Sequence, residues 1–148
     1  MLPDELSKRA VFDTYDYPAP AFVHGRVCIS GDAAYAAAPY HGAGADFAVE
    51  DATVLAQLLL AADEYTKSYD VGNGGITKPN LVRTALETYN SIRLERAHSL
   101  VKTSRHIGEI YEGQNADVGL NSKKCAEEID WRCRKVWHYD IDEMMRET

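Results

Sequence analysis

The sequence predicts a mostly helical domain with one short β-strand. Three segments, 45–65, 79–111 and 123–137, carry apolar residues at spacings of three and four, which places them on one face of an α-helix. One short apolar run, Arg26–Ser30, lies between two glycines and is typical of a strand bounded by turns. We identify no partner for this strand, because Val118–Asn121 is too short to be convincing.

The composition is that of a globular protein. The 148 residues are 45% hydrophobic, which is enough to form the core of one domain. A net charge of −7 argues against nonspecific nucleic-acid binding, which depends on lysine and arginine. The longest apolar stretch, Val54–Ala62, is far shorter than the ~20 residues that span a bilayer, and the N-terminus lacks the apolar core of a secretory signal. With three cysteines in no metal-binding spacing, we expect a cytoplasmic protein with reduced thiols that binds neither nucleic acid nor membranes.

The first long helix follows an irregular lead-in, residues 1–24, and the strand. Acidic residues in its first turns suit the positive end of the helix dipole. Its apolar residues recur at i, i+4, i+7 and i+11, so we expect its buried face to consist of Ala48, Ala52, Leu55 and Leu59. A glycine-containing surface loop, residues 66–78, ends this part of the chain.

A helical region, residues 79–148, makes up the rest of the domain. Its first helix begins at Pro79 or Asn80 and runs to about Tyr111, and its predicted buried face is Leu81, Ala85, Tyr89, Ile92, Arg96, Leu100, Thr103 and Ile107. We expect ion pairs on the surface of this helix between the arginines Arg83, Arg93, Arg96 and Arg105 and the glutamates Glu87, Glu95 and Glu109. A further helix spans residues 123–137.

The stretch from Gly25 to Leu60 predicts a binding site. It runs from the strand through Gly31-Asp32, a loop around Pro39 and a Gly-x-Gly turn at Gly42–Gly44 into the long helix. A helix N-terminus offers unpaired N–H groups and a positive dipole end, and glycines allow a ligand to approach the backbone. This order of elements therefore predicts a site for an anionic or polar ligand, with Asp32 placed to accept hydrogen bonds from ligand hydroxyls.

The same stretch resembles the second FAD-binding motif of the class A flavin-dependent aromatic hydroxylases. The shared residues are Gly31-Asp32-Ala33-Ala34, Pro39, Gly42, Gly44 and Glu50-Asp51-Ala52, all in register. The version around Pro39 is most similar to fungal salicylate hydroxylase-like monooxygenases. The resemblance continues through Tyr89-Asn90-x-x-Arg93-x-x-Arg96 to the C-terminal Trp137-x-x-Asp140, so it covers nearly all of the chain.

The resemblance implies the C-terminal portion of an α/β, Rossmann-like FAD-binding fold, with residues 25–65 as its second FAD-binding unit. We expect a single partial domain that lacks both the N-terminal dinucleotide-binding unit and the substrate sheet. No Gly-x-Gly-x-x-Gly follows a strand here, and the nearest glycine cluster, Val71–Gly75, lies between two helices.

The resemblance also assigns roles to individual residues. It implies FAD contacts from Gly31, Asp32, Pro39, Gly42, Ala43, Gly44 and Ala45. Asp32 would bind a ribityl hydroxyl, Pro39 would lie beside the isoalloxazine ring, and the amides of 42–45 would face the pyrimidine end of the flavin. His41 would line the substrate site. No catalytic residue and no metal site follows from the motif.

Two positions depart from the family pattern. Tyr35 stands where the family usually has histidine, and tyrosine donates a hydrogen bond but does not titrate near neutrality. Asp46 adds a negative charge near a site meant for an anionic reduced flavin, which opposes reduction unless its side chain points to solvent.

The activity implied by the resemblance is hydroxylation of a small aromatic substrate with NAD(P)H and O2. Because only the flavin and ribityl side of the site is expected, we predict half an FAD site and no turnover by the chain alone. Three interpretations remain open: a fragment of such an enzyme, a component completed by a separate chain, or a flavin-free binding or interaction domain. An exposed apolar face in place of the missing sheet would favour homo-oligomers or a complementing chain.

Overall fold

The computed structural model describes residues 10–68 and 77–146. In chain order the elements are β1 (Val23–His24), β2 (Val27–Cys28), α1 (Asp32–Tyr35), the 3-10 helix η1 (Pro39–His41), α2 (Gly44–Ser68), α3 (Lys78–Tyr111), α4 (Ser122–Trp137) and α5 (Ile141–Arg146). Most of the predicted loop 66–78, with the glycine cluster, lies outside the described residues, as does the start of the lead-in segment. The loop prediction is wrong at 66–68, which still belong to α2, and at Lys78, which begins α3.

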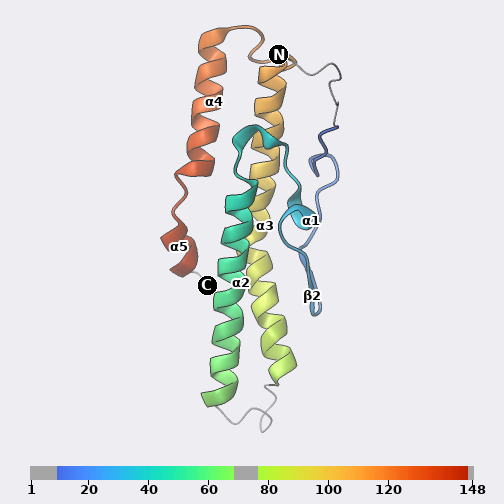
Figure 1. Ribbon diagram of the computed structural model, residues 1–148, viewed down its shortest axis with the longest axis vertical. Helices are drawn as coiled ribbons and strands as arrows, with labels where there is room; N and C mark the ends of the chain where they lie inside the picture. The colour runs from blue at the N-terminus through green and yellow to red at the C-terminus, as the bar shows by residue number, and fades with distance from the viewer. Residues whose placement is uncertain (1–9, 69–76, 147–148) are drawn as a thin grey trace, which may run out of the picture.

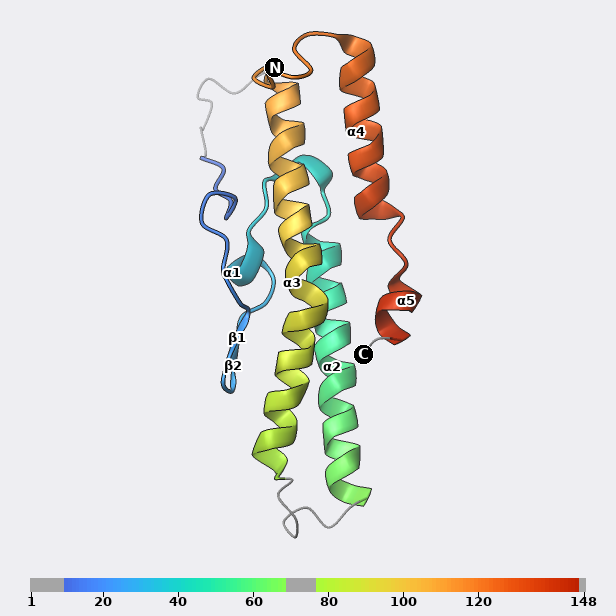
Figure 2. The same cartoon turned by 180° about the vertical axis from the view of Figure 1, so that it is seen from behind.

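Two long antiparallel helices, α2 and α3, form the centre of the molecule (Figure 1). Helices α4 and α5 lie along one side of this pair, and the hairpin β1–β2 and α1 lie along the other (Figure 2). The predicted mostly helical fold is therefore confirmed. No helix among the described residues combines the length and the apolar character that a membrane crossing requires.

Helix α3 buries the face that the sequence predicts. Ala85, Tyr89, Leu100, Thr103 and Ile107 are buried, and the other predicted positions are partly buried. The helix begins one residue before Pro79 and ends at Tyr111 as expected. Helix α4 begins at Ser122, where the Asn121 side chain accepts a hydrogen bond from the Lys124 amide and caps the first turn.

The predicted buried face of α2 is wrong at three of its four positions. Ala48, Ala52 and Leu59 are exposed and Leu55 is partly buried, whereas the buried residues of the helix are Phe47, Glu50, Asp51, Val54 and Leu58. The buried face differs from the predicted one because the carboxylates of Glu50 and Asp51 turn inward and bind arginines of α3. A pattern of apolar residues alone gives no reason to bury a charged pair.

The prediction of one unpaired strand over Arg26–Ser30 is confirmed only in part. A strand lies within this range, but it is limited to β2 at Val27–Cys28 and it pairs with β1 in a hairpin, in which Val23 lies opposite Cys28 and His24 lies opposite Val27. The turn uses Gly25 with a φ of 62°, a left-handed conformation that favours glycine. The pairing partner lies just upstream of the predicted strand, and in the described residues this hairpin is the whole sheet.

Candidate cofactor site

A hollow of about 530 Å³ lies beside the N-terminus of α2. Six of the seven residues predicted to contact a cofactor line it, namely Asp32, Pro39, Gly42, Ala43, Gly44 and Ala45. The seventh, Gly31, directly precedes Asp32. Ala37, Ala38 and Ala48 add small side chains to the lining, and Leu100 and Ser104 of α3 complete it. Small side chains leave the backbone within reach of a ligand.

The N-terminus of α2, which is the positive end of the helix dipole, borders this hollow. Gly42 ends η1 with a φ of 67° and donates its N–H to the Pro39 carbonyl oxygen at 3.0 Å. The left-handed glycine reverses the chain, so that Gly44 and Ala45 form the first turn of α2 at the edge of the hollow. The first N–H groups of a helix have no partner within it and carry its positive partial charge, which suits an anionic or polar group.

Among the described residues, Asp32 is the only carboxylate in the lining of the hollow. Its side chain is exposed, and no hydrogen-bond partner for it occurs in residues 10–68 and 77–146. Gly31 before it has a φ of 57° and a ψ of −144°, a backbone conformation that favours glycine. Asp46 is exposed and does not belong to the lining, so its charge lies outside the hollow.

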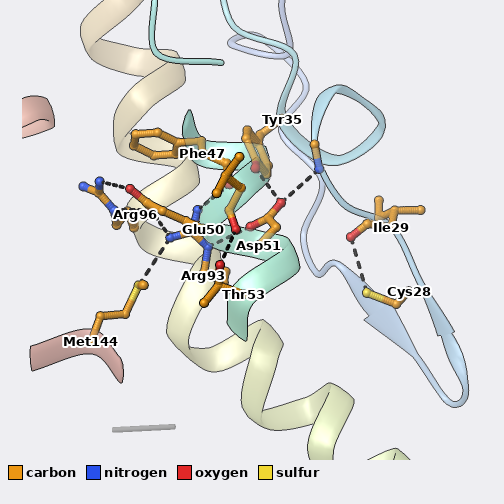
Figure 3. A network of polar contacts seen from close by, with 12 residues as sticks. Cys28, Ile29, Tyr35, Phe47, Glu50, Asp51, Thr53, Arg93, Arg96 and Met144 are labelled. Atoms are coloured by element: carbon orange, nitrogen blue, oxygen red, sulfur yellow. Dashed lines mark hydrogen bonds and ion pairs between the residues drawn. The ribbon is translucent and has the colours of Figure 1, made fainter. Parts of the chain in front are cut away.

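Asp51 holds the turn that carries Asp32. One of its oxygens, Oδ2, accepts the backbone N–H of Gly31 at 3.0 Å and the hydroxyl of Tyr35 at 2.5 Å. The other, Oδ1, accepts Nε of Arg93 at 2.7 Å (Figure 3). Tyr35, which departs from the family pattern, is therefore buried as a donor to Asp51. Burial and the hydrogen bond to Asp51 raise the pKa of Tyr35, so the donor proton is retained near neutral pH.

Arg93 lies at the centre of a buried ion cluster, which corrects the prediction of a surface ion pair. Its side chain is fully buried and binds both Glu50 and Asp51 of α2. Burial alone would lower the pKa of Arg93, but the hydrogen bond to Asp51 and the charge of Glu50 outweigh burial and raise it. Arg96 binds both oxygens of Glu50 and lies between the rings of Phe47 and Tyr139.

The other two arginines of α3, Arg83 and Arg105, differ in the ion pairs that they form. Arg83 pairs with Glu87 on the surface as predicted. Arg105 pairs instead with the buried carboxylate of Asp13, at 2.7 and 2.8 Å, and so ties the N-terminal segment to α3. The helical spacing accounts for the burial of Arg93, because it stands four residues from both Tyr89 and Ala97, which are fully buried.

His41 does not line the hollow. It is buried toward α4, with its Nδ1 3.9 Å from the Sγ of Cys133. Burial, followed by the positive charge of Arg132, lowers the pKa of His41 and favours the neutral ring. The predicted role of His41 at a substrate site stays a prediction.

Gly108 in α3 positions η1 and was not anticipated. A Cβ at Gly108 would lie 2.3 Å from the ring of Tyr40, so only glycine lets that ring rest on the helix backbone. Tyr40 also donates its hydroxyl to Glu112 at 2.9 Å. A glycine inside a 34-residue helix is unfavourable by itself, and that cost is the sequence signal for this close approach.

The chain is similar to flavin-dependent proteins. The family described as "FAD binding domain" matches residues 1–71. The chain is 74% identical over its whole length to the dual trans-enoyl reductase/FAD-dependent monooxygenase tazHJ of Aspergillus terreus, of which it covers 21%. It is 50% identical to the FAD-dependent monooxygenase orf3 of Aspergillus niger, again over its whole length and over 33% of that protein.

A solved structure described as a salicylate hydroxylase substrate complex has the same fold over most of the chain. The TM-score is 0.72 and the sequence identity 35%, and the match covers 88% of this chain and 28% of that one. The chain thus spans between about a fifth and a third of the length of the proteins it matches.

Proposed function

We propose, from the premise that this chain belongs to the FAD-dependent monooxygenase family, that it provides the flavin and ribityl side of an FAD site. The enzyme would be salicylate hydroxylase-like and would hydroxylate a small aromatic substrate with NAD(P)H and O2. The observation that carries the proposal is the hollow at the N-terminus of α2, which gathers residues from α1, η1 and α2.

The residues present suit this cofactor. The exposed carboxylate of Asp32 can accept hydrogen bonds from ribityl hydroxyls. Pro39 offers an apolar surface to a flat ring, and the first amides of α2 point positive charge at the hollow. Reduced flavin carries negative charge near N1 and O2, which that helix end would stabilise. FAD, when bound, would supply the redox and oxygen chemistry, while this chain binds and orients it.

The remainder of the site would come from another stretch of protein. Because the chain spans at most about a third of its relatives, we propose that the ADP half of FAD and the substrate sheet belong to a complementing segment or chain. Large apolar side chains exposed near the hairpin and on α2 support such a contact: Val27 (68% exposed), Val49 (65%) and Leu60 (62%).

Titration of the purified chain with FAD tests the binding role. We expect saturable binding with a micromolar Kd, followed by flavin fluorescence and a rise in Tm. Asp32→Ala should weaken binding by at least about tenfold, because a hydrogen bond to a charged group is worth roughly 1.5–3 kcal/mol. Asp63→Ala is the matched control, since Asp63 lies on α2 and its ion-pair partners in the described part of the chain are the surface lysines Lys67 and Lys78. Absence of binding at high FAD would favour a flavin-free interaction domain instead.

A chimera tests the activity. The chain would replace the corresponding segment of the Aspergillus niger relative, to which it is 50% identical. We expect the chimera to retain FAD and to oxidise NAD(P)H faster when an aromatic substrate such as salicylate is present. A chimera that folds and binds FAD but shows no response to any aromatic acid or phenol would contradict the proposed substrate class.

A further inference from the structure

We propose that Asp51 and Arg93 are positioning residues that fix the Gly31–Asp32 turn in its ligand-binding geometry, with Tyr35 as the second donor that completes the anchor. The inference rests on the proposed function only where it concerns FAD. None of the three side chains lines the hollow, so they would act through the backbone that carries Asp32.

Helix α1 needs an external anchor. It has four residues, and a single helical turn is not stable alone because nucleation fixes several residues for one hydrogen bond. The Asp51 carboxylate binds both ends of it, through the N–H of Gly31 and the hydroxyl of Tyr35, at the same oxygen. The direction in which Asp32 leaves the turn is therefore set relative to α2, whose N-terminus forms the other wall of the hollow.

Arg93 in turn fixes the Asp51 carboxylate. Its Nε binds Oδ1 of Asp51, one terminal nitrogen binds Glu50, and the other donates to the Phe47 carbonyl oxygen at 3.2 Å. Two of these contacts, to Asp51 and to the Phe47 carbonyl oxygen, do not involve Glu50 and are enough to orient the planar guanidinium, so the carboxylate plane of Asp51 is fixed as well (Figure 3). Lysine could not replace this fork, because its ammonium is a point charge on a flexible stem.

Glu50 provides a matched control within the same cluster. It is buried like Asp51 and Arg93 and binds both Arg93 and Arg96, but the hydrogen bonds from Gly31 and Tyr35 go to Asp51 and not to Glu50. Loss of its charge should therefore disturb the stability of the helix pair without releasing the turn.

The test compares Asp51→Asn, Arg93→Lys and Glu50→Gln in the 148-residue chain. The readouts are the Tm, the chemical shift and hydrogen exchange of the Gly31 amide, and the Kd for FAD. An amide at position 51 accepts on one side only, so we expect Asp51→Asn to release either the turn or Arg93. Asp51→Asn and Arg93→Lys should shift the Gly31 resonance, speed its exchange and weaken FAD binding about tenfold, the effect of losing a hydrogen bond to a charged group.

The comparison with Glu50→Gln separates a role in positioning the Gly31–Asp32 turn from a general effect on the stability of the fold. Glu50→Gln should lower the Tm to a similar extent and leave both the Gly31 amide and the Kd near the wild-type values. Tyr35→Phe, which deletes one hydroxyl, should weaken FAD binding in the same direction with a smaller loss of Tm. If all four variants weaken FAD in proportion to their loss of Tm, with the Gly31 amide unchanged, the positioning role is refuted.

The design also separates failure of this inference from failure of the proposed function. A wild-type chain that binds no FAD would contradict the proposed function, yet the Gly31 amide would still report whether Asp51 and Arg93 hold the turn. FAD binding that survives Asp51→Asn and Arg93→Lys unchanged would refute the positioning role and leave the proposed function intact.

Discussion

Replacement of Arg93 by methionine tests whether the buried ion cluster is what joins α2 to α3. Methionine keeps most of the length of the side chain and removes the charge. The change leaves Asp51 without its guanidinium partner and Glu50 with Arg96 alone, in a place where Arg93 itself has no exposed surface.

The expected loss is large. Removal of one partner from a buried ion pair costs about 3–5 kcal/mol, because the remaining charge stays buried without compensation. That is a substantial part of the ~5–15 kcal/mol that typically holds a folded domain. For a chain of this size each kcal/mol lowers the Tm by roughly 2–4 °C, so we expect a fall of at least about 6 °C.

Urea unfolding followed by far-UV circular dichroism measures the effect, since most of the signal comes from helices. Arg83→Met is the control, because Arg83 makes the same kind of ion pair on the same helix with both side chains exposed. We expect the control to be close to neutral. A loss of less than about 1 kcal/mol for Arg93→Met, similar to that of the control, would refute the view that the cluster stabilises the fold.

Three further predictions concern other contacts. The hydrogen bond from Arg105 lowers the pKa of Asp13 in the folded protein. The stability that this ion pair contributes is therefore present above about pH 4 and is lost as the pH falls through the folded-state pKa. Asp13→Asn should lower the Tm at pH 7 and flatten the acid limb of a Tm–pH curve. Burial lowers the pKa of His41 in the folded protein, so below about pH 6.5 the unfolded chain binds the proton more readily and the stability falls. His41→Gln should therefore reduce the drop in Tm between pH 7 and pH 5, and an unchanged drop would contradict this assignment. Gly108→Ala should destabilise the wild-type chain by displacing the Tyr40 ring, yet stabilise a Tyr40→Ala background by up to about 1 kcal/mol through helix propensity, which a double-mutant cycle in urea would measure.

Local patterns in the sequence predict the limits of α3 and α4 well. The limits of α3 and α4 fall within one residue of the expected positions, because proline and asparagine mark their starts and apolar periodicity marks their length. The hairpin was missed because strands of two residues are too short for any alternating pattern to appear.

The buried charges could not be predicted from local patterns. Helix α2 is rich in alanine, so a stripe through Ala48 and Ala52 fits the helical period as well as the true one through Phe47 and Val54. The choice between them depends on Arg93, which lies 42 residues from Asp51 in the sequence. Resemblance to a family found the residues of the hollow, but neither the resemblance nor the period indicated what holds the turn of Asp32 in place.

Amide chemical shifts of the labelled chain, recorded with riboflavin and separately with ADP, test the central claim most directly. Riboflavin carries the ring and ribityl chain, and ADP represents the other half of the cofactor. We predict that riboflavin moves the amides of Gly42, Gly44 and Ala45 around the hollow and that ADP leaves them unchanged. A separate hollow of about 380 Å³ is lined in part by Arg96 and Tyr139. Riboflavin shifts confined to another region, such as that hollow, or no shifts at all, would contradict the assignment of a flavin site to this part of the chain.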